Sequence, residues 1–142
     1  MRKIIIHVII VCSFLLYNAS SCYKESDDCH RYIHFTNNSG RDIYYQFNIF
    51  DEISEYNPAL SPSIYTINKN QYKRLRSTTS FTCFESIAEE GKGNIFLFLF
   101  DSDAVKSLDW ETVRENDMYL KKYVLTIEEL NKMNWKIIFT GE

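Results

Sequence analysis

The segment "IFLFLF" at residues 95–100 contains no polar residue, so neither face of a strand built from it suits exposure to water. Such a short, continuous apolar run is typical of a strand that is covered on both sides. Burial of each large apolar side chain stabilises a fold by about 1.5–3 kcal/mol. We therefore expect a central strand here, and we expect it to contribute more to the core than any other segment.

Two short helices are predicted on the C-terminal side of this strand. "DWETVREN" at 109–116 places Asp109 where a helix N-cap is expected. "TIEELNKM" at 126–133 begins with Thr126 and has Glu129 three residues later, which is the pattern of a capping box.

The rest of the chain is predicted to form short strands separated by turn residues. Alternating or apolar patterns predict strands at 30–35, 43–50, 64–67, 72–77, 81–86, 118–125 and 135–139. The turn-forming "TNNSGRD" at 36–42 predicts a hairpin between the first two of these strands. The segment at 51–63 contains both prolines and no hydrophobic period, which indicates an exposed loop. About eight strands and two small helices predict a mainly antiparallel β-sandwich, immunoglobulin-like or related, with its helices near the C-terminus.

The N-terminus has the pattern of an export signal. The basic "MRK" is followed by the apolar "IIIHVIIVCSFLLY" at 4–17. At about 1.5 Å per residue, a helix of this segment spans roughly 20 Å, which is short of the roughly 30 Å hydrocarbon core of a membrane. The segment is therefore predicted to be a signal peptide rather than a permanent membrane helix.

Ala19, Ser20, Ser21 and Cys22 follow, and this arrangement resembles a bacterial lipobox. The resemblance implies that diacylglycerol is attached to the sulfur of Cys22, that the signal is cut just before this residue, and that a fatty acid such as palmitate is added to the new amine. Two or three acyl chains anchor a protein durably, whereas one binds only reversibly. The lipobox usually has Leu at the position of Ala19. The alternative is ordinary cleavage near Ser20 or Ser21, which leaves Cys22 as a thiol.

The next residues, "CYKESDD" at 22–28, resemble the acidic tether signal of Bacteroidetes lipoproteins that reach the outer face of the outer membrane. This resemblance implies a lipid-anchored protein of the cell envelope, displayed on the surface of the outer membrane. The simpler interpretation of the same charge run is a solvated, flexible leader. The predicted organisation is a signal peptide at 1–21, a flexible acidic tether at 22–28 and a single β-sandwich domain at 29–142.

The C-terminal part is similar to the end of a group of small Bacteroidetes lipoproteins. The residues that carry this resemblance are an apolar strand followed by Asp, a Trp-containing helix, and then "LKKY", "EEL" and "MNW" between residues 120 and 135. The early "DC" and "IYY" and the "CFE" around Cys83 fit the same group, so that the match covers most of residues 28–139. The resemblance implies no particular activity.

Charge makes nucleic acid an improbable class of partner. Removal of residues 1–21 takes away Arg2 and Lys3 and no acid, so the formal net charge changes from −3 to −5. Binding to phosphate requires a concentrated basic face. The tightest basic run, "YKRLRS" at 72–77, places its charges on both faces of a predicted strand. We therefore predict no nucleic-acid partner.

The cysteines predict one disulfide. If Cys12 leaves with the signal and Cys22 carries the lipid, Cys29 and Cys83 remain, and the cell surface is an oxidising environment. In the chain-entropy model, closing this loop stabilises the fold by up to roughly 4 kcal/mol. A zinc site is the alternative, but the cysteines lack CxxC spacing.

No catalytic, metal or cofactor site is predicted. The chain has no GxSxG, HExxH or P-loop pattern. His30 and His34 lie on a predicted strand, where residues four apart are separated by about 13 Å and cannot share an ion. The acidic residues Asp101, Asp103 and Glu90 show no spacing that indicates a catalytic pair, and turn formation and helix capping are simpler roles for them.

Aromatic residues are the strongest sign of binding, because a tyrosine offers a flat face and a polar tip to a sugar ring or a protein. The candidate contacts are Tyr32, Tyr44, Tyr56 and Tyr65. The alternative is that these rings pack the sandwich and its rim. The predicted function is that of a non-catalytic binding module for a glycan or small ligand. The alternative is a structural or assembly subunit that binds an envelope protein through an exposed edge strand.

Overall fold

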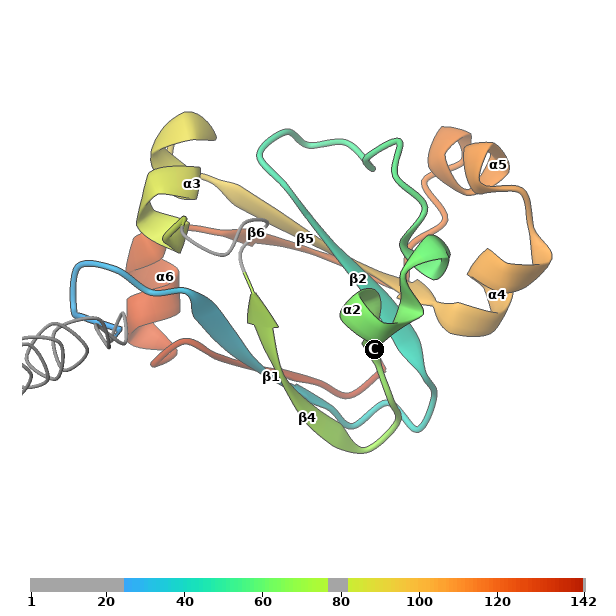
Figure 1. The fold of residues 1–142 in the computed structure, drawn as a ribbon, viewed down its shortest axis with the longest axis horizontal. Coiled ribbons are helices and arrows are strands. Elements are labelled where there is room, and N and C mark those ends of the chain that lie inside the picture. The colour runs from blue at the N-terminus through green and yellow to red at the C-terminus, as the bar shows by residue number, and fades with distance from the viewer. Residues whose placement is uncertain (1–24, 77–81, 142) are drawn as a thin grey trace, which may run out of the picture.

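The computed structural model describes residues 25–76 and 82–141. The predicted signal peptide, Cys22 and the first residue of the predicted strand 81–86 lie outside the described residues. The strands are β1 (Tyr32–Asn37), β2 (Ile43–Asn48), β3 (Thr66–Ile67), β4 (Gln71–Arg76), β5 (Ile95–Asp101), β6 (Lys121–Leu125) and β7 (Lys136–Phe139). They form two sheets that face each other (Figure 1).

The smaller sheet has the strand order β4-β1-β7, and the larger has the order β3-β2-β5-β6. All neighbouring strands are antiparallel except β1 and β7, which run parallel. The mainly β, sandwich-like architecture is therefore confirmed. The strand order differs from that of an immunoglobulin domain, in which the first two strands share a sheet.

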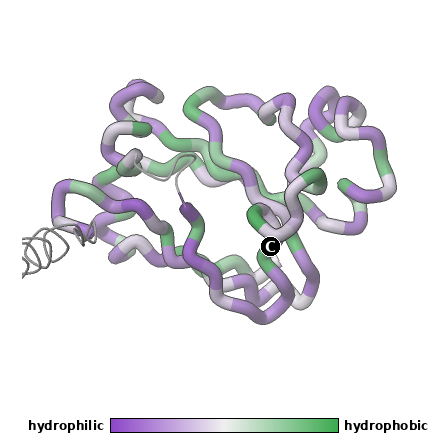
Figure 2. Tube along the Cα trace, in the orientation of Figure 1, coloured by the Kyte–Doolittle hydropathy of each residue, from purple (hydrophilic) through white to green (hydrophobic). Residues whose placement is uncertain are grey.

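Strand β5 is buried on both faces, as its sequence predicts. Leu97 and Leu99 are fully buried in the main core between the two sheets. Phe98 and Phe100 point to the opposite face of the larger sheet, where they pack in a second cluster with residues that include Trp110. Figure 2 shows hydrophobic residues concentrated along the strands and hydrophilic residues in much of the surrounding loops and helices.

Short helices pack at both ends of the sandwich and over the outer face of the larger sheet. The α-helices are α2 (Pro62–Tyr65), α3 (Phe84–Glu90), α4 (Ser102–Ser107), α5 (Trp110–Glu115) and α6 (Ile127–Lys132), with a 3-10 turn at Pro58–Leu60. Helices α3 and α6 lie at one end of the sandwich, while α4 and α5 lie together at the other (Figure 1) and cover the outer face of the larger sheet. The two predicted helices are confirmed together with their caps: the Asp109 side chain accepts from the Glu111 N–H, and Thr126 and Glu129 form the capping box.

Two predicted strands are wrong in half of their length or more. In the first, at 64–67, Pro62 starts a helical turn and only Thr66 and Ile67 are extended. In the second, at 81–86, Phe84 begins helix α3. This helix buries Phe84, Ile87 and Ala88, whose spacing of three and four residues is that of one helix face.

The predicted hairpin between the first two strands is also wrong. Strands β1 and β2 belong to different sheets, and residues 38–42 carry the chain across the edge of the sandwich. Ile33 and Phe35 of β1 face Ile43 and Tyr45 of β2 within one core cluster instead of lying beside them. Apolar residues of both strands are thereby buried against each other.

Asn37 holds this crossing in place. Its side chain is fully buried, and its Nδ2 donates to the carbonyl oxygens of Arg41, Ile67 and Asn68 at 2.8, 3.1 and 3.2 Å. Its Oδ1 accepts from the N–H and hydroxyl of Ser39 at 3.0 and 2.6 Å. One amide group therefore joins the crossing to the connection between β3 and β4.

We expect Asn37→Ala to lower the free energy of unfolding by about 3 kcal/mol, because buried carbonyl groups lose their donor. Asn38→Ala is the matched control, because Asn38 is exposed and holds Phe139 through its backbone N–H alone. Its expected change is within about 0.5 kcal/mol. Urea unfolding followed by circular dichroism measures both, and equal effects of the two substitutions would contradict the role assigned to Asn37.

Candidate binding surface

The outer face of the smaller sheet is the candidate site. Side chains alternate between the two faces of a strand, and in β1 the buried Ile33 and Phe35 alternate with half-exposed residues. The outer face is formed by Tyr32, His34 and Thr36 of β1, Tyr72, Arg74 and Arg76 of β4, and Lys136 and Ile138 of β7. We call this surface the cationic face.

Three rows of side chains cross the cationic face. The rows are Arg76 and Tyr32; Arg74, His34 and Lys136; and Tyr72, Thr36 and Ile138. Because neighbouring strands lie about 4.8 Å apart, the Cα atoms of Arg74 and Lys136 are separated by about 10 Å. The three cations Arg74, Arg76 and Lys136 therefore lie on one surface of the sheet.

Tyr32 positions both arginines. Arg76 Nη2 donates a hydrogen bond to Tyr32 Oη at 2.9 Å, and this bond lowers the pKa of Tyr32. The guanidinium carbons of Arg74 and Arg76 lie 4.8 and 5.5 Å from the centre of the Tyr32 ring, within cation–π range. The ring therefore supports two guanidinium groups.

The cations of this face have no carboxylate partner within 4.0 Å in the described part of the chain. Cations that do pair with a carboxylate are Arg41, Lys106, Arg114, Lys122 and Lys132. Glu25 acts electrostatically on Tyr32, and its carboxylate, which accepts a hydrogen bond from the Arg31 N–H at 3.1 Å, forms no ion pair with these cations. The charge of the face is therefore available to an external anion.

A polar groove adjoins the face at Tyr72. The Tyr72 side chain is 56% exposed, and its hydroxyl lies 2.5 Å from His34 Nδ1. The groove has a volume of about 430 Å³ and is lined by Pro62, Ser63, Thr66, Ile67, Asn68, Gln71, Tyr72 and Lys73. Its hydroxyl and amide groups can hydrogen-bond to a polar ligand.

The four predicted tyrosine contacts occupy three different places. Tyr32 lies on the cationic face, whereas Tyr56 and Tyr65 lie together elsewhere, with ring centres 5.6 Å apart. Tyr56 is exposed and Tyr65 is half-buried. The prediction for Tyr44 is corrected: its side chain is only 2% exposed, because the cluster around Trp110 covers that face of the larger sheet.

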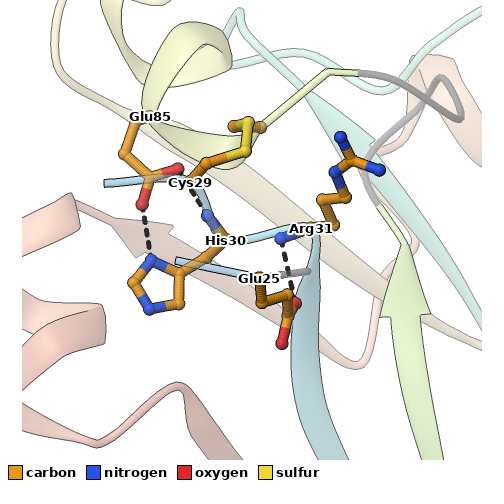
Figure 3. Close-up of a disulfide and its surroundings, with 6 residues drawn as sticks. Glu25, Cys29, His30, Arg31 and Glu85 are labelled. Carbon is orange, nitrogen blue, oxygen red and sulfur yellow. Dashed lines mark hydrogen bonds and ion pairs between the residues drawn. A yellow bond between two sulfur atoms is a disulfide. The ribbon is translucent and has the colours of Figure 1, made fainter. Parts of the chain in front are cut away.

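The predicted disulfide is present, and its surroundings have a structural role. Cys29 and Cys83 are bonded, with their Cα atoms 5.1 Å apart. Beside them, Glu85 accepts hydrogen bonds from the His30 backbone N–H at 2.9 Å and approaches His30 Nδ1 at 2.6 Å (Figure 3). The His30 ring stacks on Trp135 with centres 3.9 Å apart. These contacts fix the segment before β1 onto α3.

The residues weighed for metal binding or catalysis have other roles. His30 and His34 are engaged by different partners, Glu85 and Tyr72. Asp101 caps α4 and pairs with Arg41 at 3.0 Å. Burial tends to raise the pKa of Asp101, but its hydrogen bonds outweigh that effect and lower it. No group of three or more potential metal ligands occurs among residues 25–76 and 82–141.

Comparison of the chain with models of protein families, with curated proteins and with solved structures gives no match. Within the described residues, no helix has the length and apolar character needed to cross a membrane.

Most of the cationic face was not predicted from the sequence. The charges of "YKRLR" do divide between two faces, but only Lys73 points inward, while Arg74 and Arg76 share the outer face with Tyr72. That alternation was visible in the sequence. The contribution of Lys136 was not, because it depends on the parallel pairing of β7 with β1.

Behind the cationic face, the buried Tyr45 makes stability sensitive to alkaline pH. Desolvation raises the pKa of Tyr45 from 10.0 to about 12. The ring of Tyr65 lies 5.7 Å away, and Lys73 Nζ lies 5.5 Å from the ring centre. Burial also lowers the pKa of Lys73, whose amine donates to the Ile64 and Thr66 carbonyls. Titration of Lys73 therefore makes the free energy of unfolding rise with pH, whereas titration of Tyr45 makes it fall.

We expect the free energy of unfolding to fall between pH 10 and 12, because the unfolded chain loses the Tyr45 proton while the folded chain keeps it. Tyr45→Phe should remove at most about 3 kcal/mol of this decline. Tyr72→Phe is the control, because it also removes one tyrosine hydroxyl, but from an exposed residue. Urea unfolding at several alkaline pH values measures the slopes, and an unchanged slope in Tyr45→Phe would disprove the assignment.

Proposed function

We propose that this protein is a non-catalytic, glycan-binding lipoprotein, anchored through Cys22 to the surface of the outer membrane, and that it binds through the cationic face. The observation that carries the proposal is the open outer face of the smaller sheet, with Tyr32, His34 and Tyr72 beside an adjoining polar groove. A flat surface with aromatic rings and hydrogen-bonding groups suits an extended, hydroxyl-rich ligand.

Binding is favoured over catalysis by the roles of the polar side chains. Asp101 and Glu85, which are acids in ordered positions, cap a helix and hold a chain segment. Neither lies on the cationic face. A surface that is exposed to solvent also excludes little water, whereas catalytic sites are generally enclosed.

The resemblance of residues 19–28 to a lipobox and tether supports the anchor. A short tether before the disulfide would keep the folded part near the membrane surface. This location would suit a module that captures polymers from outside the cell.

The alternative function is that of an assembly subunit. Its support comes from edge strands β6 and β7, where Val124 is 47% and Ile138 is 63% exposed. These strands are short, with five and four residues, so they offer a limited surface for strand addition. Cross-linking in intact membranes that yields one stoichiometric partner through β6 or β7 would favour this alternative.

For the anchor, we expect Cys22→Ser to move the protein from the membrane fraction to the soluble fraction, because the acylated sulfur is lost. Cys12→Ser is the matched control and should leave the fractionation unchanged, because Cys12 lies within the predicted signal. Mass spectrometry of the native N-terminus should show an acylated Cys22. A native chain that begins with an unmodified thiol and remains soluble would refute the anchor.

For the ligand, we expect the full chain to bind at least one class of polysaccharide on an array that includes neutral and acidic glycans. The variant Tyr72→Ala should weaken this binding at least tenfold, since it removes the exposed ring between the face and the groove. Phe50→Ala is the control, because Phe50 is similarly exposed but lies outside the cationic face. Isothermal titration measures both, and the absence of binding to every glycan would remove the proposed function.

A further inference from the structure

We infer that the ligand of the cationic face is an acidic polysaccharide, and that Arg74 and Arg76, supported by Tyr32, bind its carboxylate or sulfate groups. This inference rests on the proposed function and names the chemical class of its ligand. It follows from the arrangement of the three cations on the face.

The two arginines of β4 form a pair of like charges. Arg74 and Arg76 are two residues apart on one face of β4, so their Cα atoms are separated by about 7 Å. The guanidinium carbons of both residues lie within 5.5 Å of the centre of the Tyr32 ring, so these like charges are close enough to repel each other. No carboxylate pairs with either of them in the described part of the chain. An anion bound between the two guanidinium groups would relieve this repulsion.

The side chains of Arg74 and Arg76 are already ordered by Tyr32 before a ligand binds. The Tyr32 ring contacts both guanidinium groups, and its hydroxyl accepts a hydrogen bond from Arg76. Long side chains normally lose rotamer entropy when they bind a ligand, and prior ordering reduces that loss. The planar guanidinium group matches the paired oxygens of a carboxylate or sulfate. The site is therefore suited to oxyanions rather than to neutral hydroxyl groups alone.

The spacing of the three cations bears on the size of the ligand. Lys136 lies across the sheet from Arg74, at about 10 Å between Cα atoms, with His34 between them. A small anion bound by Arg74 and Arg76 need not contact all three cations at once. A polymer that carries repeated anionic groups can do so, and each additional contact raises its affinity.

Among polyanions, the polar groove beside the cations favours a polysaccharide. Beyond the cations, the exposed Tyr72 leads to a groove lined by hydroxyl and amide side chains that include Ser63, Asn68 and Gln71. These groups suit the uncharged hydroxyls of a sugar chain. Nucleic acid fits less well, because three cations neutralise few phosphates and the formal net charge of the chain is −3.

The test uses pairs of polysaccharides that differ only in charge: dextran sulfate with dextran, and polygalacturonate with its methyl ester. We expect the full chain to bind a charged member at least tenfold more tightly than its neutral partner. We also expect this binding to weaken as salt is raised, since charged contacts are screened. Isothermal titration at low and physiological salt measures both effects.

The double variant R74Q/R76Q should lose at least tenfold in affinity for the charged polysaccharide. R74K/R76K retains both charges but lacks the guanidinium fork, so an intermediate loss is expected. The matched control K92Q/K132Q removes two exposed charges outside the cationic face and should change the affinity less than threefold. Circular dichroism establishes that each variant is folded, which the exposure of these residues favours.

Three outcomes would overturn the inference. If neutral and charged partners bind equally, and R74Q/R76Q binds like the parent, the ligand is a neutral glycan and the proposed function survives. If R74Q/R76Q and K92Q/K132Q lose affinity equally, the arginines have no specific role. If no glycan binds, but vesicles of anionic phospholipid bind in an arginine-dependent way, the face contacts a membrane and both proposals fail.

Discussion

The burial of β5 on both faces is the constraint on which the rest of the structure depends. Its apolar residues alternate between two clusters, so the larger sheet must be covered twice. The smaller sheet covers one face, and α4, α5 and the loop that contains Ile53 cover the other. The smaller sheet has no such requirement, because its aliphatic residues other than Ile138 face inward. Its outer face is therefore left open for polar, charged and aromatic residues, and the candidate binding surface follows from the way the core is built.

Local chemistry in the sequence was sufficient to predict some elements and not others. The run at 95–100 has no soluble face, and the caps at Asp109 and Thr126 act within one helical turn, so these features need no distant contact. The connection at 38–42 is different. Residues such as Asn, Ser and Gly allow a sharp change of direction both in a hairpin and in a crossing between sheets. The choice is made by Asn37, whose amide reaches carbonyl groups about thirty residues away along the chain.

The candidate binding surface was predictable only in part, for a similar reason. Alternation along β1 and β4 is a local property, and it places Tyr32, Arg74 and Arg76 on one face. Two other features depend on tertiary structure. Lys136 joins the face through a parallel pairing, and Tyr44 is hidden by helices that follow β5 in the sequence. Helix α3 was mistaken for a strand because "FTCFES" at 81–86 contains Phe and Thr, which are favoured in strands, while the helical spacing of Phe84, Ile87 and Ala88 extends beyond that segment.

The position of Cys29 has a mechanical consequence. Strand β1 is the central strand of its sheet and begins three residues after this cysteine. A force applied to the chain before Cys29 passes through the covalent bond to Cys83 and into α3, as well as into β1. The first hydrogen bonds of β1 with β4 and β7 therefore do not carry the whole load. A fluid flow or a moving polymer that drags on the molecule would have to displace α3 and Trp135 together with the strand, which makes progressive peeling from the N-terminal end difficult.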